Sequence, residues 1–441
     1  MEDAFIITGG KKLIGEVLLS GAKNVSLKVI IASLLYNTEV MLKNVPKITD
    51  VVELLDLIKE LGGRAEFIEK NTVVIDGKNL KKNRVDLLHA SKIRVSFMLF
   101  APLLYKFMSC YVPNPGGCRI GARPIDRIVE GMKKLGVKID YDSETGYYDA
   151  RMSQKPTGSY RFQKPSHTGT ELLILLSVFG RDRITLENCA REPEIDELIR
   201  FLNAGGARIK RDGSRITIDS VTHLRSVSPF AITSDRNEAV TFATLAILTK
   251  GDVTIGAADT SHLESFIKEM KGVGAGVEKI NDKTLRFYYS GPLRSSQIET
   301  SPHPGFMTDW QPNWAVLMTQ AAGESVIHER VFENRFSYVE ELRKLGAEID
   351  YVKVPVRDPT EYFFFNFDSG KKYNQAIRIK GPQTLHGGVL NVSDLRAGAT
   401  LVLAALIAQD ESVVNGASII ERGYENIVNK IKELGGEIEK M

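Results

Sequence analysis

The 441-residue sequence has few of the residues expected in a metalloprotein, a disulfide-rich secreted protein or a nucleic-acid-binding protein. It contains 3 cysteines, and an odd number without regular spacing argues against a disulfide framework. Its 7 histidines are dispersed and show no zinc or iron ligand spacing. The formal net charge of +3 is too small to indicate a nucleic-acid partner by itself. We therefore expect no metal and no nucleic acid.

Other absences concern location and nucleotide-binding motifs. No apolar run approaches the roughly 18 residues that a membrane-spanning helix needs. The first five residues, Met1 to Phe5, do not combine a basic region with an apolar one, so no signal peptide is predicted. Together with the few cysteines, this predicts a cytoplasmic protein without a membrane partner. No Walker or Rossmann glycine fingerprint is present, because Gly116, Gly117 and Gly121 do not follow a strand at the required spacing.

The sequence does contain a repeated pattern, which occurs six times. Each copy has an amphipathic helix, then a glycine or glycine pair, then a short strand. Apolar residues at i, i+3 or i+4 mark one buried helical face, and the glycine is a suitable helix C-cap. The copies are Leu57–Phe67, Met132–Ile139, Ile199–Ile209, Ile267–Val277, Leu342–Ile349 and Ile431–Ile438.

A second helix of a different kind precedes each copy. These helices are apolar almost all round, which predicts that they are buried. Each begins at a cluster of polar residues, in which Asp or Ser is typical of an N-cap. The predicted ranges are Val25–Leu35, Val95–Leu104, Glu171–Val178, Ala239–Leu248, Trp314–Ala322 and Ala397–Ala408.

The six copies divide naturally into two sets of three, which predicts an α/β protein with two domains. Each domain would have three buried helices inside, with sheets and amphipathic helices outside. We predict a first domain at residues 23–232, which contains the loop around Cys118. The second domain is predicted to be discontinuous, formed by residues 1–22 and 233–441.

Cationic residues recur where these helices begin. Helix N-termini carry unpaired N–H groups and partial positive charge, and they bind anions. Arginine suits carboxylates and phosphates because its planar guanidinium bonds two oxygens at once. If the helix starts face one another, they would form a cleft selective for anionic ligands; each cation could alternatively serve in a surface or interdomain ion pair. The cations are Lys23, Arg94, Arg123, Arg396 and Arg422.

The run Pro113–Pro124 is the only one that combines a thiol with several glycines, prolines and arginines. Its two arginines are near enough to Cys118 to favour a thiolate and to hold an anion beside it. Taken alone, a cysteine in a glycine-rich loop is as often structural as reactive. Cys110 lies in an apolar run and Cys189 follows a predicted strand, so both are expected to be core residues.

Two further polar residues are candidates for chemistry. Asp309 precedes the fifth buried helix and could be its N-cap. It could also be a general base, which must reach a substrate hydroxyl within hydrogen-bond distance, and the two roles are compatible. His167 lies at the start of the third buried helix, where a ligand contact or a cap is favoured over catalysis.

Several motifs follow one another over almost the whole chain, from Ser20 to Glu425. They are Ser20–Asn24, Asn44–Lys47, Gly116–Pro124, Arg191–Ile195, Pro302–Pro304, Thr308–Asp309, Phe332–Phe336, Asp394–Ala397 and Arg422–Glu425. In this order they resemble the enolpyruvyl transferase family, and within it the UDP-N-acetylglucosamine 1-carboxyvinyltransferases. The glycine-cysteine loop followed by Gly-Ala-Arg-Pro is the most specific of them.

The resemblance implies a pair of inside-out α/β barrels and a defined reaction. The enolpyruvyl group of phosphoenolpyruvate would pass to the 3′-hydroxyl of UDP-N-acetylglucosamine, through a tetrahedral intermediate and with release of phosphate. This reaction is the first committed step of peptidoglycan synthesis. The resemblance further implies that these two small molecules are the partners, that no cofactor is used, that the protein is a monomer, and that fosfomycin alkylates Cys118.

The resemblance also implies roles for individual residues. Cys118 would protonate the methylene carbon and Asp309 would take the proton of the sugar hydroxyl, with Lys23 and Asp394 as further catalytic residues. Phosphoenolpyruvate would be held by Lys23, Arg94, Arg123, Arg396 and Arg422. UDP-N-acetylglucosamine would contact Asn24, Arg94, Arg123, Pro124, Ile125, Asp126, Arg127, Lys164, Ser166, His167, Thr168, Asp309, Val331 and Arg335.

The chain departs from the family pattern on the nucleotide side. Ser166–Thr170 replaces a small apolar segment, and Val25–Lys28 places a lysine in a normally apolar helix start. Two alternatives stay open. One is the sister enzyme that uses shikimate 3-phosphate as acceptor, which lacks the cysteine loop. The other is a sensor that binds UDP-sugars without activity, which would have no need of an acid such as Cys118.

Overall fold

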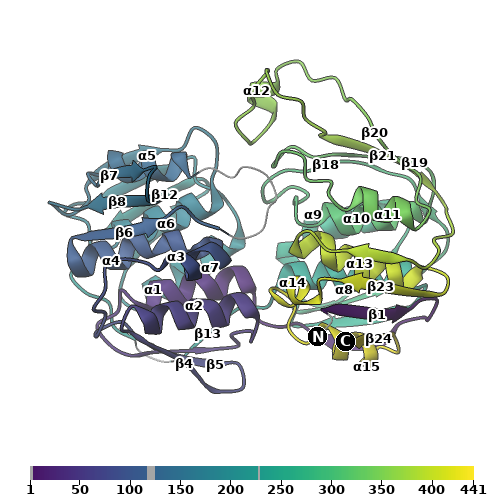
Figure 1. Cartoon of the computed structure of the whole chain (residues 1–441), viewed down its shortest axis with the longest axis horizontal. Coiled ribbons are helices and arrows are strands. Elements are labelled where there is room, and N and C mark those ends of the chain that lie inside the picture. The colour runs from purple at the N-terminus through teal and green to yellow at the C-terminus, as the bar shows by residue number, and fades with distance from the viewer. Residues whose placement is uncertain (1–2, 117–124, 227–228) are drawn as a thin grey trace. The chain divides into compact units, whose positions relative to one another are not determined.

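The structure is a computed structural model that describes residues 3–116, 125–226 and 229–441. These residues form two compact units (Figure 1). The N-terminal unit contains residues 21–116, 125–226 and 229–233. The C-terminal unit contains residues 3–20 and 234–441, so the first strand of the chain lies among the last ones, as the purple β1 between yellow strands shows in Figure 1.

The buried helices lie where the sequence predicts them, but they begin one to four residues earlier because polar residues form their first turns. The second is irregular: it starts as a 3-10 helix and becomes α-helical at Phe100. This change places Pro102 in the first α-helical turn, where its missing N–H is tolerated. The helices are α1 Lys23–Ser33, η1 Arg94–Leu99 with α4 Phe100–Phe107, α6 His167–Ser177, α8 Arg236–Leu248, α10 Gln311–Thr319 and α13 Leu395–Ile407.

The six amphipathic helices are each followed by a strand, as predicted. In every copy the turn between them contains a glycine with φ between +92° and +101°, a conformation that favours glycine because it has no Cβ. These glycines are Gly62, Gly136, Gly206, Gly274, Gly346 and Gly435. The helices are α2 Thr49–Glu60, α5 Asp126–Lys134, α7 Pro193–Ala204, α9 Glu264–Gly272, α11 Val339–Lys344 and α15 Ile427–Glu433. Shorter helices are α3 Leu87–Lys92, η2 Thr260–Leu263, α12 Pro359–Tyr362 and α14 Ala417–Glu421.

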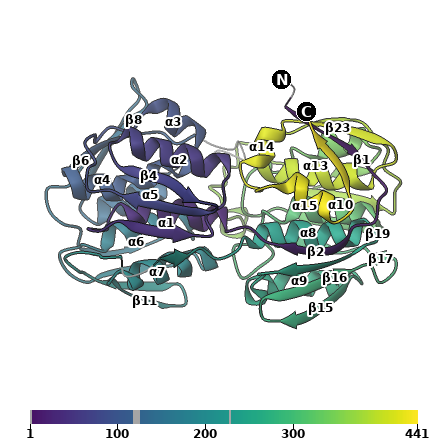
Figure 2. The ribbon, with the colours of Figure 1, turned by 90° about the horizontal axis from the view of Figure 1, so that it is seen from below.

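The described strands form six small sheets, three in each unit (Figure 2). In the N-terminal unit their orders are β13-β3-β5-β4, β6-β8-β7 and β11-β12-β10-β9. In the C-terminal unit they are β15-β16-β14-β2, β22-β23-β1-β24 and β17-β19-β21-β20, with β18 also paired to β19. Five of the sheets mix parallel and antiparallel pairs, which confirms the α/β class.

The strand bounds follow the same division. In the N-terminal unit they are β3 Val40–Lys43, β4 Arg64–Glu69, β5 Thr72–Asp76, β6 Ser109–Pro113, β7 Lys138–Asp142, β8 Tyr147–Arg151, β9 Gly158–Arg161, β10 Ile184–Glu187, β11 Arg208–Asp212, β12 Arg215–Asp219 and β13 Phe230–Ala231. In the C-terminal unit they are β1 Ala4–Thr8, β2 Ile14–Leu18, β14 Asp252–Gly256, β15 Gly276–Asn281, β16 Thr284–Tyr288, β17 Leu293–Arg294, β18 Gln297–Glu299, β19 Ala321–His328, β20 Ile349–Tyr351, β21 Ala376–Gly381, β22 Val389–Asn391, β23 Glu411–Asn415 and β24 Glu437–Lys440.

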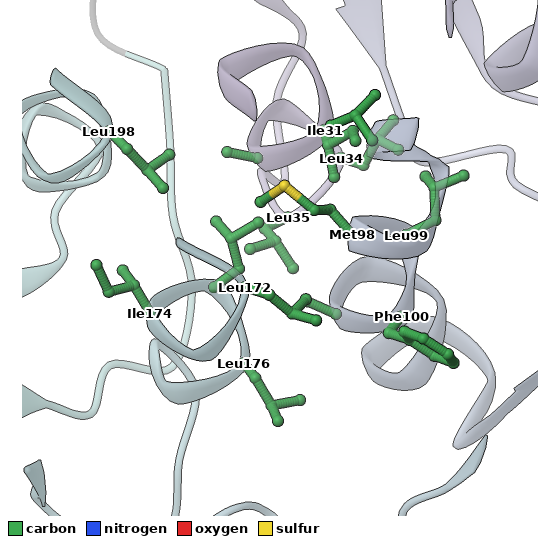
Figure 3. Packing of buried hydrophobic residues seen from close by; sticks show 14 of the residues in the cluster. Ile31, Leu34, Leu35, Met98, Leu99, Phe100, Leu172, Ile174, Leu176 and Leu198 are labelled. Carbon is green, nitrogen blue, oxygen red and sulfur yellow. The ribbon is translucent and has the colours of Figure 1, made fainter. Parts of the chain in front are cut away.

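The core of the N-terminal unit is apolar and lies between its buried helices. Figure 3 shows Ile31 of α1, Met98 of η1 and Leu172 of α6 among the side chains that fill it. Helix α7 closes this core with Leu198 and packs against both α1 and α6. None of the helices in the described part of the chain is both long and apolar enough to cross a membrane.

The buried helices of the C-terminal unit are joined by polar side chains as well as by apolar ones. Asn313 of α10 donates to Thr241 of α8 at 3.1 Å and accepts from Thr400 of α13 at 2.7 Å. Tyr424 adds a hydroxyl contact to Thr241 at 2.9 Å. A satisfied polar network of this kind fixes how buried elements align. It therefore aligns α8 with α10 and α13, and the starts of α10 and α13 carry candidate site residues.

Candidate functional site

Asp309 lies two residues before α10 but does not cap it, so that interpretation of the sequence is wrong. The N-cap residue is Trp310, and no side chain accepts a capping hydrogen bond there. Asp309 instead accepts from Arg335 Nη2 at 2.6 Å through Oδ1 and from Arg396 Nε at 3.4 Å through Oδ2. Both arginines are buried, whereas the Asp309 side chain is 21% exposed. The carboxylate is thus oriented by two guanidinium groups and still accessible to a ligand.

Arg335 is itself held by a buried glutamate. Its Nη1 donates to Thr308 Oγ1 at 2.7 Å, and Thr308 donates to Glu329 Oε2 at 2.8 Å. The other Glu329 oxygen accepts the backbone N–H of Val331 at 2.7 Å. Burial raises the pKa of Glu329, although the charge of Arg335 acts in the opposite direction. Because the Val331 N–H is already used, any substrate contact at Val331 must come from its other atoms.

Arg396 and Asp394 are brought together at the start of α13. Asp394 caps the helix, because its Oδ1 accepts the N–H groups of Arg396 at 2.9 Å and Ala397 at 3.1 Å. Its other oxygen accepts from Ser337 Oγ at 3.2 Å. The cap was predicted from the sequence, whereas a catalytic role for Asp394 stays a prediction. Arg396 also has a buried Nη1 with no hydrogen-bond partner in the described part of the chain.

This unpaired Arg396 nitrogen is unfavourable in the absence of a ligand. A buried donor without a partner costs about 1–3 kcal/mol, and more when the group is charged. Burial by itself lowers the pKa of Arg396, but the neighbouring Tyr424, Asp309 and Asp235 raise it, so the guanidinium stays charged. An anionic ligand oxygen would satisfy both the hydrogen bond and the charge.

The N-terminal unit places two of the predicted cations at the starts of its buried helices. Lys23 is the first residue of α1 and is buried, with its Nζ 2.8 Å from Asp50 Oδ2. Arg94 is the first residue of η1, partly exposed, with its guanidinium 5.9 Å from the Phe97 ring centre. Asn24 follows Lys23 on α1 and is also partly exposed.

The start of α6 contains the residues predicted to contact the nucleotide. Ser166 is its N-cap, and its Oγ accepts the N–H of Gly169 at 3.2 Å. His167 is the first helical residue, and its Nε2 lies 3.2 Å from Oε1 of the buried Glu171. Thr168 and Lys164 are partly exposed. Contact of this segment with a nucleotide stays a prediction.

The remaining predicted residues are distributed over other elements. Ile125 is the buried N-cap residue of α5, and Asp126 and Arg127 are its first two residues. Arg422 follows α14 and is partly exposed. Cys118, Arg123 and Pro124 lie outside the described residues.

The other two cysteines are core residues, as predicted from the sequence. Cys110 and Cys189 are both buried free thiols. Burial raises the pKa of both, to about 12 for Cys189. Since the thiolate is the reactive form, neither is a candidate nucleophile or acid near neutral pH.

Three acidic residues of these clusters were not found from the sequence: Asp50, Glu171 and Glu329. Each is buried beside a cation, which is distant in the sequence for Asp50 and Glu171 and six positions away, at Arg335, for Glu329. Glu329 stands just before the Phe332–Phe336 motif, which is the only local signal for any of them. A single sequence gives no pairing between distant residues, so their roles became visible only in the structure.

The loop that carries Asp309 rests on an aromatic cluster formed by Phe266, Phe306, Trp310 and Trp314. The rings of Phe266 and Trp310 lie 5.8 Å apart, and those of Phe306 and Trp314 lie 5.3 Å apart, both in edge-on arrangements. Trp310 Nε1 also donates to Asn237 of α8 at 3.0 Å. These contacts fix the backbone on both sides of Asp309.

Replacing Phe266 with Ala is expected to lower the free energy of unfolding of the C-terminal unit by about 3–5 kcal/mol, because it leaves a cavity in this cluster. The change is measured as a lower urea midpoint. Ile280→Ala is the control, because Ile280 is 50% exposed and its truncation should change stability by less than about 0.5 kcal/mol. Equal midpoints for the two variants would show that the cluster does not support the loop.

The sequence matches one family model and full-length relatives. The family model for EPSP synthase (3-phosphoshikimate 1-carboxyvinyltransferase) matches residues 7–431. The UDP-N-acetylglucosamine 1-carboxyvinyltransferase of Desulforapulum autotrophicum is 37% identical over 440 residues, covering 100% of both chains. That of Finegoldia magna is 36% identical over 429 residues, covering 97% of this chain and 96% of the relative.

Two solved structures have the same fold. The enolpyruvyl transferase NikO from Streptomyces tendae matches with a TM-score of 0.86 and 21% identity, covering 99% of this chain and 98% of the other. EPSP synthase from Acinetobacter baumannii matches with a TM-score of 0.72 and 18% identity, covering 99% of both chains. At these identities the likeness extends to the fold alone.

Proposed function

The chain belongs to the EPSP synthase family of enolpyruvyl transferases, and we propose that its acceptor substrate is UDP-N-acetylglucosamine. As a member of this family it is an enzyme that transfers the enolpyruvyl group of phosphoenolpyruvate. The proposed product carries this group on the 3′-oxygen of the sugar, the first committed step of peptidoglycan synthesis. The full-length relatives at 34–37% identity support this acceptor over shikimate 3-phosphate.

The observation that carries the proposal is the group of Asp309, Arg335 and Arg396. It offers an accessible carboxylate beside a buried arginine nitrogen that has no hydrogen-bond partner among the described residues. A base for a hydroxyl and a donor for an anion are the two groups that addition of an alcohol to phosphoenolpyruvate needs. A protein that only binds a nucleotide sugar would need neither arrangement.

In the proposed reaction the sugar 3′-oxygen forms a bond to C2 of phosphoenolpyruvate. Asp309 accepts the hydroxyl proton, and Cys118, which lies outside the described residues, donates a proton to C3. Phosphate then leaves C2 with its bonding electrons, and a proton passes from C3 back to the Cys118 thiolate, which restores the double bond. Asp309 returns its proton to solvent. Arg335 and Arg396 orient the Asp309 carboxylate throughout.

The proposal assigns the remaining groups to substrate binding. Phosphoenolpyruvate, with its carboxylate and phosphate, would be held by Lys23, Arg94, Arg123, Arg396 and Arg422. The nucleotide sugar would contact Asn24, Ile125, Asp126, Arg127, Lys164, Ser166, His167, Thr168, Val331 and Arg335, in addition to Arg94, Arg123, Pro124 and Asp309. The proposed architecture behind these contacts is the inside-out α/β barrel of three repeats in each unit.

The purified protein is expected to release inorganic phosphate when phosphoenolpyruvate and UDP-N-acetylglucosamine are both present, and to form a nucleotide sugar heavier by one enolpyruvyl group. The matched reaction contains shikimate 3-phosphate in place of the nucleotide sugar. Turnover with shikimate 3-phosphate alone would overturn the proposed acceptor. Binding of UDP-N-acetylglucosamine without turnover of either acceptor would favour the sensor alternative.

A further inference from the structure

Helices α1 and α6 of the N-terminal unit each carry a buried charge in an otherwise apolar sequence. Lys28 is 5% exposed and Glu171 is fully buried, and Lys28 Nζ lies 3.3 Å from Glu171 Oε2. Removing two such ions from water costs several kcal/mol each, so a buried pair is not explained by stability alone. The next residue in the chain after Glu171, Leu172, belongs to the apolar core and is labelled in Figure 3.

A histidine completes this cluster. His167 is one turn before Glu171 on α6, and its Nε2 lies 3.2 Å from Glu171 Oε1. In the described part of the chain, the two Glu171 carboxylate oxygens and His167 Nε2 are buried and have no well-aligned hydrogen bond. One carboxylate oxygen of Glu192, at the start of α7, is also buried without a hydrogen bond there. The ionisable groups that face His167 are therefore Glu171 on its own helix, Lys28 from α1 and Glu192 before α7.

The charges in this cluster balance only when His167 is an imidazolium. Two carboxylates then face two cations, whereas a neutral imidazole leaves a net negative charge in a buried place. Burial by itself lowers the pKa of His167, but Glu171 and Glu192 outweigh burial and the repulsion from Lys28, so the pKa is raised. No group of three His, Cys, Asp or Glu side chains in the described residues is arranged to hold a metal ion.

The position of this cation is unusual for a helix. His167 is at the N-terminus of α6, where the helix dipole is positive and a further positive charge is unfavourable. Its Nε2 is buried against Glu171, whereas the side chain as a whole is 25% exposed, so the exposed part of the ring lies away from Nε2. Nδ1–H and the helix N-terminus thus both offer positive charge to a ligand, and an anion would offset the unfavourable arrangement.

We propose that Glu171 and Lys28 are positioning residues that hold His167 as an imidazolium, whose Nδ1–H donates to a phosphate oxygen of the acceptor substrate. Lys28 neutralises one Glu171 oxygen, and the other oxygen faces His167. The inference rests on the proposed function, in which the start of α6 contacts the nucleotide. It adds a pH-dependent determinant of acceptor affinity, in which His167 and Lys28 lie in the two segments where this chain departs from the family pattern.

The expected pH dependence follows from the raised pKa of His167. The imidazolium is present below this pKa and is lost as the pH rises through it. KM for UDP-N-acetylglucosamine should therefore be lowest at pH values below the pKa of His167 and should increase at pH values above it. A hydrogen bond to a charged group contributes roughly a ten- to hundred-fold change in affinity. KM for phosphoenolpyruvate, measured in the same reactions, should not show this rise.

Three variants test the cluster. His167→Val should give a high acceptor KM at every pH, without the inflection. Glu171→Gln should move the inflection to lower pH, because the charge that favours the imidazolium is gone. Lys28→Met/Glu171→Leu replaces the buried pair by apolar side chains of similar size, a change that buried pairs tolerate, and it should act like Glu171→Gln. A wild-type pH profile in His167→Val or Glu171→Gln would overturn the proposal.

Histidine NMR tests the same point without catalysis. The His167 resonance is assigned as the one missing in His167→Val, and it should titrate above 6.5 in the wild type and lower in the double variant. Adding UDP should shift this resonance. If the protein does not turn over UDP-N-acetylglucosamine but the shift occurs, the proposed function fails and the assignment of His167 stands. A wild-type pKa at or below 6.5, or no shift with UDP, would refute the assignment.

Discussion

Replacing Asp309 with Asn is expected to lower kcat by about a hundred- to ten-thousand-fold, the usual contribution of a positioned acid or base. The amide keeps the shape of the carboxylate and can still accept from Arg335 through its oxygen. It cannot take a proton from the sugar hydroxyl. Phosphate release under saturating substrates measures the loss.

The same substitution is expected to leave KM for phosphoenolpyruvate unchanged or to lower it. Arg335 and Arg396 lose the carboxylate that they share, so more of their positive charge acts on an anionic ligand. A fall in kcat with an unaltered or lower KM indicates a group used in the transition state rather than in binding. A purely structural role would instead raise KM or reduce the folded fraction.

Asp350→Asn is the matched control for this experiment. It makes the same change in the same unit, on β20, where Asp350 pairs with Arg378 at 3.0 Å on the surface. An exposed pair of this kind contributes about 0–1 kcal/mol, so activity should match the wild type. If folded Asp309→Asn protein retained a kcat within five-fold of the control, Asp309 would not be the base.

The secondary structure could be predicted because it depends on local patterns. Each amphipathic helix shows its apolar face within a few residues, and glycines such as Gly62 and Gly435 have the left-handed φ that their position suggests. The helix starts were placed too late for a physical reason. Lys23 and Arg396 are polar, and a pattern of apolar residues excludes them, yet both lie within the first turn and are buried there by ion pairing.

The site could be predicted as a set of residues but not as a set of contacts. Asp309 was compatible with an N-cap because only its neighbours in the chain were visible. Its partners Arg335 and Arg396 are 26 and 87 positions away. The ion pair of Lys28 with Glu171 likewise joins two helices that are far apart in the sequence. Partners of this kind depend on how helices pack, and a motif does not record that packing.

Fosfomycin, an epoxide, is expected to alkylate the protein once, at Cys118. The thiolate would attack an epoxide carbon, the carbon–oxygen bond would open, and the oxygen would take a proton, so the mass increases by one complete inhibitor molecule. The structure supplies the reason for a single adduct. Cys110 and Cys189 are buried, and their raised pKa values leave almost no thiolate near neutral pH.

Intact-mass spectra of matched variants test this selectivity. Cys110→Ala and Cys189→Ala should still gain one adduct, whereas Cys118→Ser should gain none. Cys118→Ser should also lose about a hundred- to ten-thousand-fold in kcat while it keeps its affinity for UDP-N-acetylglucosamine, since it lacks the proposed acid. An adduct on Cys118→Ser, or an unchanged rate, would contradict the proposed role. The two measurements separate a thiol that is merely reactive from one that donates the proton to C3.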